Sequence, residues 1–173
     1  PRCFRSEVEG VNAKSTLQWP GAALDGVARL RLLAKLLPNV RLVERVVEAP
    51  YERVRAALDD VETTIPKVDS IVRKVQVTER DQNLLTMRVH TKFFPAMLFT
   101  CETADGHLIM RAPLNLYVVA LGARPVDDGR TLYAQFEGIP RAAGRLAAWG
   151  IGRHVANDAN CFQRLFPRGD ETS

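Results

Sequence analysis

Histidine is the side chain that most often acts as an acid, a base or a metal ligand near neutral pH, and this chain has three. His90 falls on the polar side of an alternating segment, where we expect it to be solvated. His107 directly follows an Asp-Gly turn signature and is also expected to be exposed. His154 lies slightly off the apolar stripe of a helix, so it either reaches the interior or stays in solvent. The histidines are far apart in sequence and form no H-x-x-x-H pair, so no metal site is predicted.

Other signatures of catalysis or cofactor binding are missing from the sequence. It contains no G-x-S-x-G motif, no P-loop and no G-x-G-x-x-G fingerprint. The Gly-Ile-Gly run at residues 150–152 is too short to cradle a phosphate. Glu102 and Glu137 alternate out of phase with the apolar residues around them, so we expect both carboxylates to be solvated. The sequence therefore predicts no cofactor and shows no catalytic set.

The composition is that of one ordinary globular domain. The 173 residues are 46% hydrophobic and 25% charged, which argues against disorder and collagen. The net charge is +4 and the basic residues are scattered, so we expect no nucleic-acid partner. No uncharged apolar run approaches the ~18 residues that span a bilayer. Cys3, Cys101 and Cys161 form no C-x-x-C pair, which favours reduced thiols in a cytoplasmic protein.

The elements that must position any site begin with a helix over about residues 22–37. Its apolar residues recur at helical spacing with basic residues between them. Such a helix either packs on its own domain or contacts a membrane surface or another protein. Both interpretations are open at this point.

A strand is predicted over residues 40–48, followed by two short helices that begin near Pro50 and near Thr63 or Thr64. Six strand-like runs then follow, at residues 71–80, 84–94, 97–103, 107–112, 114–124 and 131–138. Short turns join them, so we expect an antiparallel meander. If the last hairpin has a two-residue turn, Leu121 lies opposite Phe136.

The last predicted element is a long helix over residues 141–166. At roughly 1.5 Å per residue it would be about 39 Å long, enough to cross a sheet. Gly144, Gly150 and Gly152 are poor helix formers. They indicate either close packing or a kinked, thin wall beside a ligand.

Two short motifs accompany this order of elements. The first is VVEAPYERV at residues 46–54 with LDDV at 58–61, and the second is DGRT at 128–131. Together with the order of elements, the first motif resembles the opening of the SRPBCC superfamily and the second resembles its last hairpin. The group includes polyketide cyclase/dehydrase-like proteins and START-type lipid-transfer proteins. The resemblance covers about residues 40–166. It departs from the pattern at Val68, where many members carry an aromatic residue after the retained Pro66.

The resemblance implies an α+β, helix-grip fold. A seven-stranded curved antiparallel sheet wraps around a long C-terminal helix, with two short helices after the first strand. The expected organisation is an N-terminal arm over 1–39, a helix-grip domain over 40–166 and a tail over 167–173. In this fold a cavity lies between sheet and helix.

We expect that cavity to bind a small hydrophobic or amphipathic ligand, such as a lipid, an isoprenoid or a polyketide-like molecule, without metal. The expected lining residues are Met87, Val89, Phe93, Phe99, Cys101, Tyr117, Val119, Phe136, Trp149 and Phe162. The alternative is a metal-free enzyme of the cyclase/dehydratase type acting in the same cavity. Its proton-transfer residues would then be among Tyr117, Arg111, Tyr133 and His154.

Overall fold

The computed structural model describes residues 21, 23–104, 106–140 and 145–167, with the side chains of 115 and 145–149 excepted. The elements in chain order are α1 (Gly26–Leu36), β1 (Val40–Val47), α2 (Tyr51–Asp59), α3 (Val61–Val68), β2 (Val72–Asp81), β3 (Leu84–Thr91), β4 (Met97–Ala104), β5 (His107–Arg111), the 3₁₀ turn η1 (Pro113–Asn115), β6 (Val118–Asp127), β7 (Arg130–Gly138) and α4 (Arg145–Arg164).

The seven strands form one antiparallel sheet in the order β1-β7-β6-β5-β4-β3-β2. Consecutive strands from β2 to β7 are neighbours because each pair is joined by a short connection. β1 forms the edge of the sheet opposite β2 and pairs with β7. This is the α+β, helix-grip arrangement that the sequence predicted.

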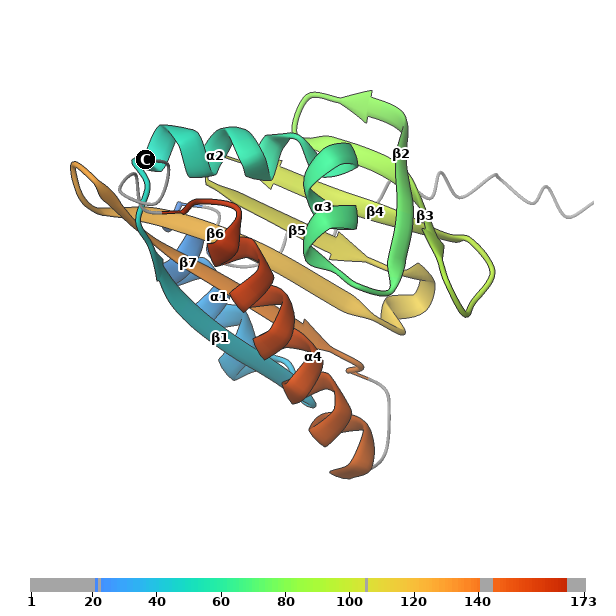
Figure 1. Cartoon of the computed structure of the whole chain (residues 1–173). Helices are drawn as coiled ribbons and strands as arrows, with labels where there is room; N and C mark the ends of the chain where they lie inside the picture. The colour runs from blue at the N-terminus through green and yellow to red at the C-terminus, as the bar shows by residue number, and fades with distance from the viewer. Residues whose placement is uncertain (1–20, 22, 105, 141–144, 168–173) are drawn as a thin grey trace, which may run out of the picture.

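Helices cover both faces of the sheet. Figure 1 shows α2, α3 and α4 on one side of the strands and α1 on the other. The face under α4 carries the larger buried apolar cluster, which joins residues of β2 to β7 to α2, α3 and α4. We call this the inner face, and the opposite one the outer face.

The apolar stripe of α1 is buried against this chain's own sheet. Val27, Leu30 and Leu33 are fully buried and cluster with Ile109 and Phe136 of the outer face. The helix begins where Asp25 accepts a hydrogen bond from the Ala28 N–H at 2.9 Å. Of the two interpretations of this helix, the structure shows the one in which it packs on its own domain.

The expected register of the last hairpin was wrong by one residue. Asp127 does lie opposite Arg130, but Pro125 lies opposite Thr131, so Val126 is an extra residue in a bulge. Leu121 therefore faces Gln135 rather than Phe136. Because strand side chains alternate, this slip moves Phe136 to the outer face.

Two smaller expectations also differ from the structure. Asp60, rather than Thr63 or Thr64, caps α3, accepting a hydrogen bond from the Thr63 N–H at 3.3 Å. In α4, a Cβ at Gly150 would meet nothing within 4 Å and one at Gly152 would make only ordinary contact with the Arg41 side chain, so close packing does not explain these glycines. The third glycine, at position 144, lies outside the described residues.

Candidate functional site

A cavity of about 570 Å³ lies between the inner face of the sheet, α3 and α4. Its walls are mainly apolar and include Ile65, Val68, Val89, Phe99, Val119 and Leu121. The strand alternation predicts this lining, because every second residue of β3, β4 and β6 points to the same face. The loop between β3 and β4 supplies Phe94, which lines the cavity and is also 63% exposed, so this loop forms part of the rim.

Polar side chains interrupt the apolar wall on the side of β7 and α4. They include Tyr117, Gln135, Glu137, His154 and Asp158. The first three come from the sheet side, and the last two lie one helical turn apart on α4. In an otherwise apolar cavity, these groups are the ones that can orient a ligand.

Glu137 is buried, and both of its carboxylate oxygens accept hydrogen bonds. The Tyr117 hydroxyl donates to Oε2 at 2.5 Å, and the Gln135 amide donates to Oε1 at 2.8 Å. The Tyr133 hydroxyl in turn donates to the side-chain amide oxygen of Gln135, Oε1, at 2.9 Å. Since residues 133, 135 and 137 alternate along β7, all three side chains share the inner face. The network fixes the orientation of the carboxylate at the cavity wall.

Burial dominates the acid–base properties of this network. Desolvation raises the pKa of the Glu137 carboxyl, and it raises the pKa of the Tyr117 phenol well above its usual value. The negative charge of Glu137 raises the pKa of Tyr117 further. A tyrosine in this position is a hydrogen-bond donor at neutral pH.

His154 faces three carboxylates through one ring nitrogen. Its Nε2 lies 3.4 Å from Asp158 Oδ2, 3.6 Å from Asp69 Oδ2 and 3.7 Å from Glu137 Oε2. Interaction with Asp69, followed by the charges of Glu137 and Asp158, raises the pKa of His154 despite its partial burial. Burial raises the pKa of Asp158. The donor atoms of Asp69, His154 and Asp158 all lie within 4.8 Å of one another, so these residues could hold a metal ion.

The comparisons with solved structures agree with this architecture. A START superfamily protein from Mycobacterium smegmatis superposes with a TM-score of 0.61 at 11% identity, over 73% of this chain and 96% of the other. The ZhuI aromatase/cyclase from Streptomyces sp. R1128 gives a TM-score of 0.55 at 21% identity, over 73% and 93% of the two chains. The chain has a START-like helix-grip fold.

A third structure with the START-like helix-grip fold is the di-domain aromatase/cyclase BexL from the BE-7585A biosynthetic pathway. It matches with a TM-score of 0.52 at 11% identity, over 82% of this chain and 54% of that one. No family model matches the sequence, and the search of curated proteins gives no match. At these identities, the structural neighbours establish the fold alone.

Five of the expected lining residues do line the cavity of this START-like fold, and they come from β3, β4, η1–β6 and α4. They are Val89, Phe99, Tyr117, Val119 and Phe162. Met87 and Cys101 also point to the inner face but are buried in the core, away from the cavity. Trp149 falls outside the residues whose side chains are described.

Two expected lining residues lie elsewhere. Phe136 is on the outer face under α1, as a consequence of the bulge in β6. Phe93 is 75% exposed, because β3 ends at Thr91 and the alternation does not continue into the loop. Its neighbour Phe94 takes the position at the rim.

Of the four residues expected to take part in proton transfer, two reach the cavity and two do not. Tyr117 and His154 reach the cavity. Tyr133 is fully buried beside it, where its ring stacks on Phe162 with centroids 3.9 Å apart. Arg111 follows the cavity-lining Met110 on β5 and so points to the outer face.

Four polar residues expected in solvent are buried or paired. Glu137 lines the cavity, since the register that sequence patterning suggested was shifted by one residue. His107 is buried under α1 and Glu102 pairs with Arg29 of that helix. His90 is half-buried and lies 3.1 Å from the Gln76 amide oxygen.

Asp69 and Asp158 were missed altogether. Asp158 had a usable signal, because His154 and Asp158 are spaced i,i+4 and must share one helix face. Asp69 had none, since its approach to α4 depends on how α3 packs.

Proposed function

We propose that the chain binds a small apolar or amphipathic molecule in the cavity between the sheet and α4. The observation that carries this proposal is the cavity itself. Its volume of about 570 Å³ falls within the roughly 300–1,000 Å³ typical of small-molecule sites, and its walls are mainly apolar. Affinity would come chiefly from burying ligand surface, at about 25 cal/mol per Å² before the costs of association.

The distribution of polarity supports a ligand with one polar end. Apart from Thr91, the lining side chains from β3, β4 and the rim loop are apolar, among them Val89 and Phe99. The side chains from β7 and α4 include Glu137 and His154. A lipid-like or polyketide-like molecule would place its hydrocarbon against the first group and its oxygen atoms near the second. The START and aromatase/cyclase neighbours are in keeping with such a ligand.

A cavity-filling variant tests the proposal. Val119 lines the cavity wall on β6, so Val119→Trp should occupy part of the volume. Leu98 on β4 is 47% exposed and points away from the cavity, so Leu98→Trp is a matched control. The probe is N-phenyl-1-naphthylamine, whose fluorescence rises on transfer to apolar surroundings.

We expect saturable binding to the wild type and to Leu98→Trp, and at least a tenfold loss in Val119→Trp with an unchanged circular dichroism spectrum. Equal binding by both tryptophan variants would contradict binding in this cavity. Native mass spectrometry of the purified chain can then identify a hydrophobic molecule that it retains.

The second candidate is an enzyme of the cyclase/dehydratase type. The specific observation in its favour is that Tyr117, Glu137 and His154 line the same apolar cavity. In an aldol-type ring closure, a base removes a proton from the carbon next to one carbonyl, and that carbon bonds to a second carbonyl carbon. A donor protonates the oxygen of the second carbonyl, and loss of the resulting hydroxyl as water completes the dehydration. Because its acidic neighbours raise the pKa of His154, the imidazole and the Tyr117 phenol would be the donors, and the Glu137 carboxylate would be the base.

The two candidates differ in one measurement. With a poly-β-ketone thioester mimic as substrate, an enzyme would form cyclic product at a rate that falls sharply in Tyr117→Phe and His154→Gln. A binding protein would hold the mimic without accelerating its cyclisation, and both variants would match the wild type in product formation.

A further inference from the structure

Asp69, His154 and Asp158 converge at the cavity wall from two separate parts of the chain. Asp69 is the C-cap residue of α3, and the other two lie one turn apart on α4. The Asp69 Oδ1 atom accepts a hydrogen bond from the Ile71 N–H at 2.8 Å. That bond fixes the carboxylate so that its other oxygen, Oδ2, faces His154.

The distances within this cluster fit metal ligands better than hydrogen bonds. His154 Nε2 lies 3.4 Å from the Asp158 oxygen and 3.6 Å from the Asp69 oxygen, outside the roughly 2.7–3.2 Å of an N–H···O bond. Two atoms bonded to one tetrahedral Zn²⁺ at about 2.0–2.2 Å lie roughly 3.3–3.6 Å apart. Two of the three ligand pairs therefore already have the separation that one cation would impose, and the third pair, Asp69 with Asp158, lies within 4.8 Å.

Asp158 provides a second, independent observation. It is fully buried and lines the cavity, yet neither of its carboxylate oxygens accepts a hydrogen bond from the described residues. A buried carboxylate left in this way is costly unless a cation compensates it. His154 alone, at 3.4 Å, supplies no hydrogen bond to it.

We propose that Asp69, His154 and Asp158 bind one divalent transition-metal ion of the Zn²⁺ type. One imidazole and two carboxylates form a three-ligand set of the kind that leaves a coordination position for water or a ligand. Glu137 stays outside the set, because Tyr117 and Gln135 already donate to its two oxygens. The metal ion would give the polar side of the cavity a centre that attracts a ligand oxygen. This inference goes beyond the sequence expectation, which was no metal.

Metal titration of the full-length chain tests the proposal. Protein treated with EDTA and dialysed is titrated with ZnCl₂ by calorimetry, and with Co²⁺ by visible absorption. We expect one equivalent to bind, with a Co²⁺ spectrum typical of nitrogen and oxygen ligands. Asp158→Asn and His154→Gln should each weaken binding by about 100-fold or more, since even residues that only support metal ligands cost about 10–100-fold. The control is His90→Gln, which removes a half-buried histidine remote in sequence and should bind as the wild type does.

A stability measurement excludes unfolding as the cause of lost binding. In metal-free protein, Asp158→Asn keeps the shape of the side chain and leaves the carboxylates of Asp69 and Glu137 facing His154, so its melting temperature should stay close to that of the wild type. Wild-type affinity in Asp158→Asn, the absence of saturable Zn²⁺ binding, or a Co²⁺ spectrum with thiolate charge-transfer bands would each overturn the proposal. Binding of N-phenyl-1-naphthylamine by the metal-free protein tests the cavity separately, so either proposal can fail without the other.

Discussion

At the scale of single residues, polar groups in this cavity depend on partners supplied by the fold. Glu137 is buried in an apolar wall, and its two oxygens take hydrogen bonds from Tyr117 and Gln135. Without those donors the carboxylate would pay the full cost of desolvation. Asp158, which lines the same cavity from α4, has no such donors among the described residues. Glu137 is therefore a hydrogen-bond acceptor held in place by its donors, whereas Asp158 is the carboxylate that a bound cation would stabilise.

Removing the Tyr117 hydroxyl should therefore destabilise the fold. Tyr117→Phe keeps the ring but leaves Glu137 Oε2 without its donor, and we expect a loss of about 1–3 kcal/mol in the free energy of unfolding. Urea denaturation measures it. Thr78→Val is the control, because it removes an exposed hydroxyl that donates to the Thr86 carbonyl. If Tyr117→Phe is as stable as this control, the hydrogen bond does not contribute as described.

Cys101 tests the boundary between core and cavity. It is fully buried, and desolvation raises the pKa of its thiol to about 12. Because the thiolate is the reactive form, Cys101 should resist a disulfide reagent at pH 8 in folded protein and react fully in denaturant. The measurement uses a variant with serine at positions 3 and 161. Rapid reaction of the folded variant would place this thiol in the cavity or at the surface instead.

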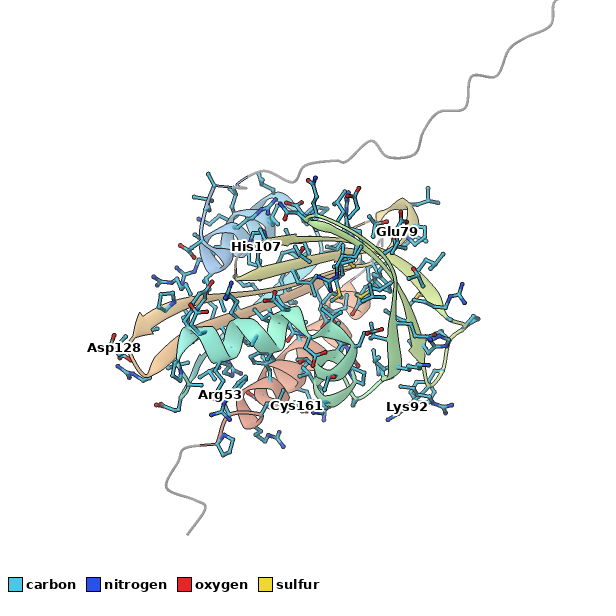
Figure 2. All side chains as sticks on the ribbon, turned by 90° about the horizontal axis from the view of Figure 1, so that it is seen from above. Arg53, Glu79, Lys92, His107, Asp128 and Cys161 are labelled. Carbon is cyan, nitrogen blue, oxygen red and sulfur yellow. The ribbon has the colours of Figure 1, made fainter. Side chains whose placement is uncertain are left out.

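At the scale of elements, α1 owes its position to ionic contacts as well as to its apolar stripe. Arg29 is fully buried and pairs with Glu102 of β4 at 2.7 Å, while its guanidinium also donates to His107 of β5. Figure 2 shows His107 beside this helix. Arg31 forms a bidentate salt bridge with Glu44 of β1, and this pair is exposed to solvent.

The two arginines should differ greatly in their effect on stability. Arg29→Met leaves its anionic and imidazole partners without their buried cation, so the free energy of unfolding should fall by about 3–5 kcal/mol. Arg31→Met breaks only an exposed pair and should change it little. Urea denaturation of both variants makes the comparison on a single helix. Similar losses in the two would show that burial does not distinguish these contacts.

Glycine permits the close approach of α1 to the sheet. A Cβ at Gly26 would lie 2.3 Å from the Gly106 carbonyl oxygen, whereas a Cβ at Gly150 in α4 meets nothing within 4 Å. Gly26→Ala should therefore cost about 1–3 kcal/mol through overpacking. Gly150→Ala should instead stabilise the protein by up to about 1 kcal/mol, since alanine favours the helix. Thermal unfolding compares them, and a stabilising Gly26→Ala would contradict the close contact.

The sequence allowed the elements to be predicted better than their partners. Alternation and turn residues located β2 to β7, helical spacing located α4, and the resemblance supplied the curvature of the sheet around that helix. One bulged residue, Val126, was enough to misplace Phe136 and to hide Glu137, because a register slip exchanges the two faces. Nothing in the sequence marks that bulge. Asp69 was missed for the same kind of reason, because its approach to His154 is set by packing and not by local pattern.

At the scale of the whole molecule, the two faces of the sheet differ. The outer face packs closely against α1 through a buried apolar cluster that includes Leu30, Leu33 and Phe136. The inner face packs against α2 and α4 at one end but leaves the cavity beside α3 and the rim loop. None of the helices in the described part of the chain has the length and hydropathy of a membrane span. The apolar residues of this chain thus serve two purposes, a filled core and a cavity lining.

Occupancy of the cavity is the central claim, and methyl-resolved NMR tests it most directly. The full chain is titrated with N-phenyl-1-naphthylamine while the methyl resonances are followed. We predict saturable shifts at Val89, Val119 and Leu121, which line the cavity, and unchanged resonances at Leu30 and Leu33 on the opposite side of the sheet. Shifts confined to the α1 side, or an absence of saturable shifts at the three cavity residues, would contradict the account.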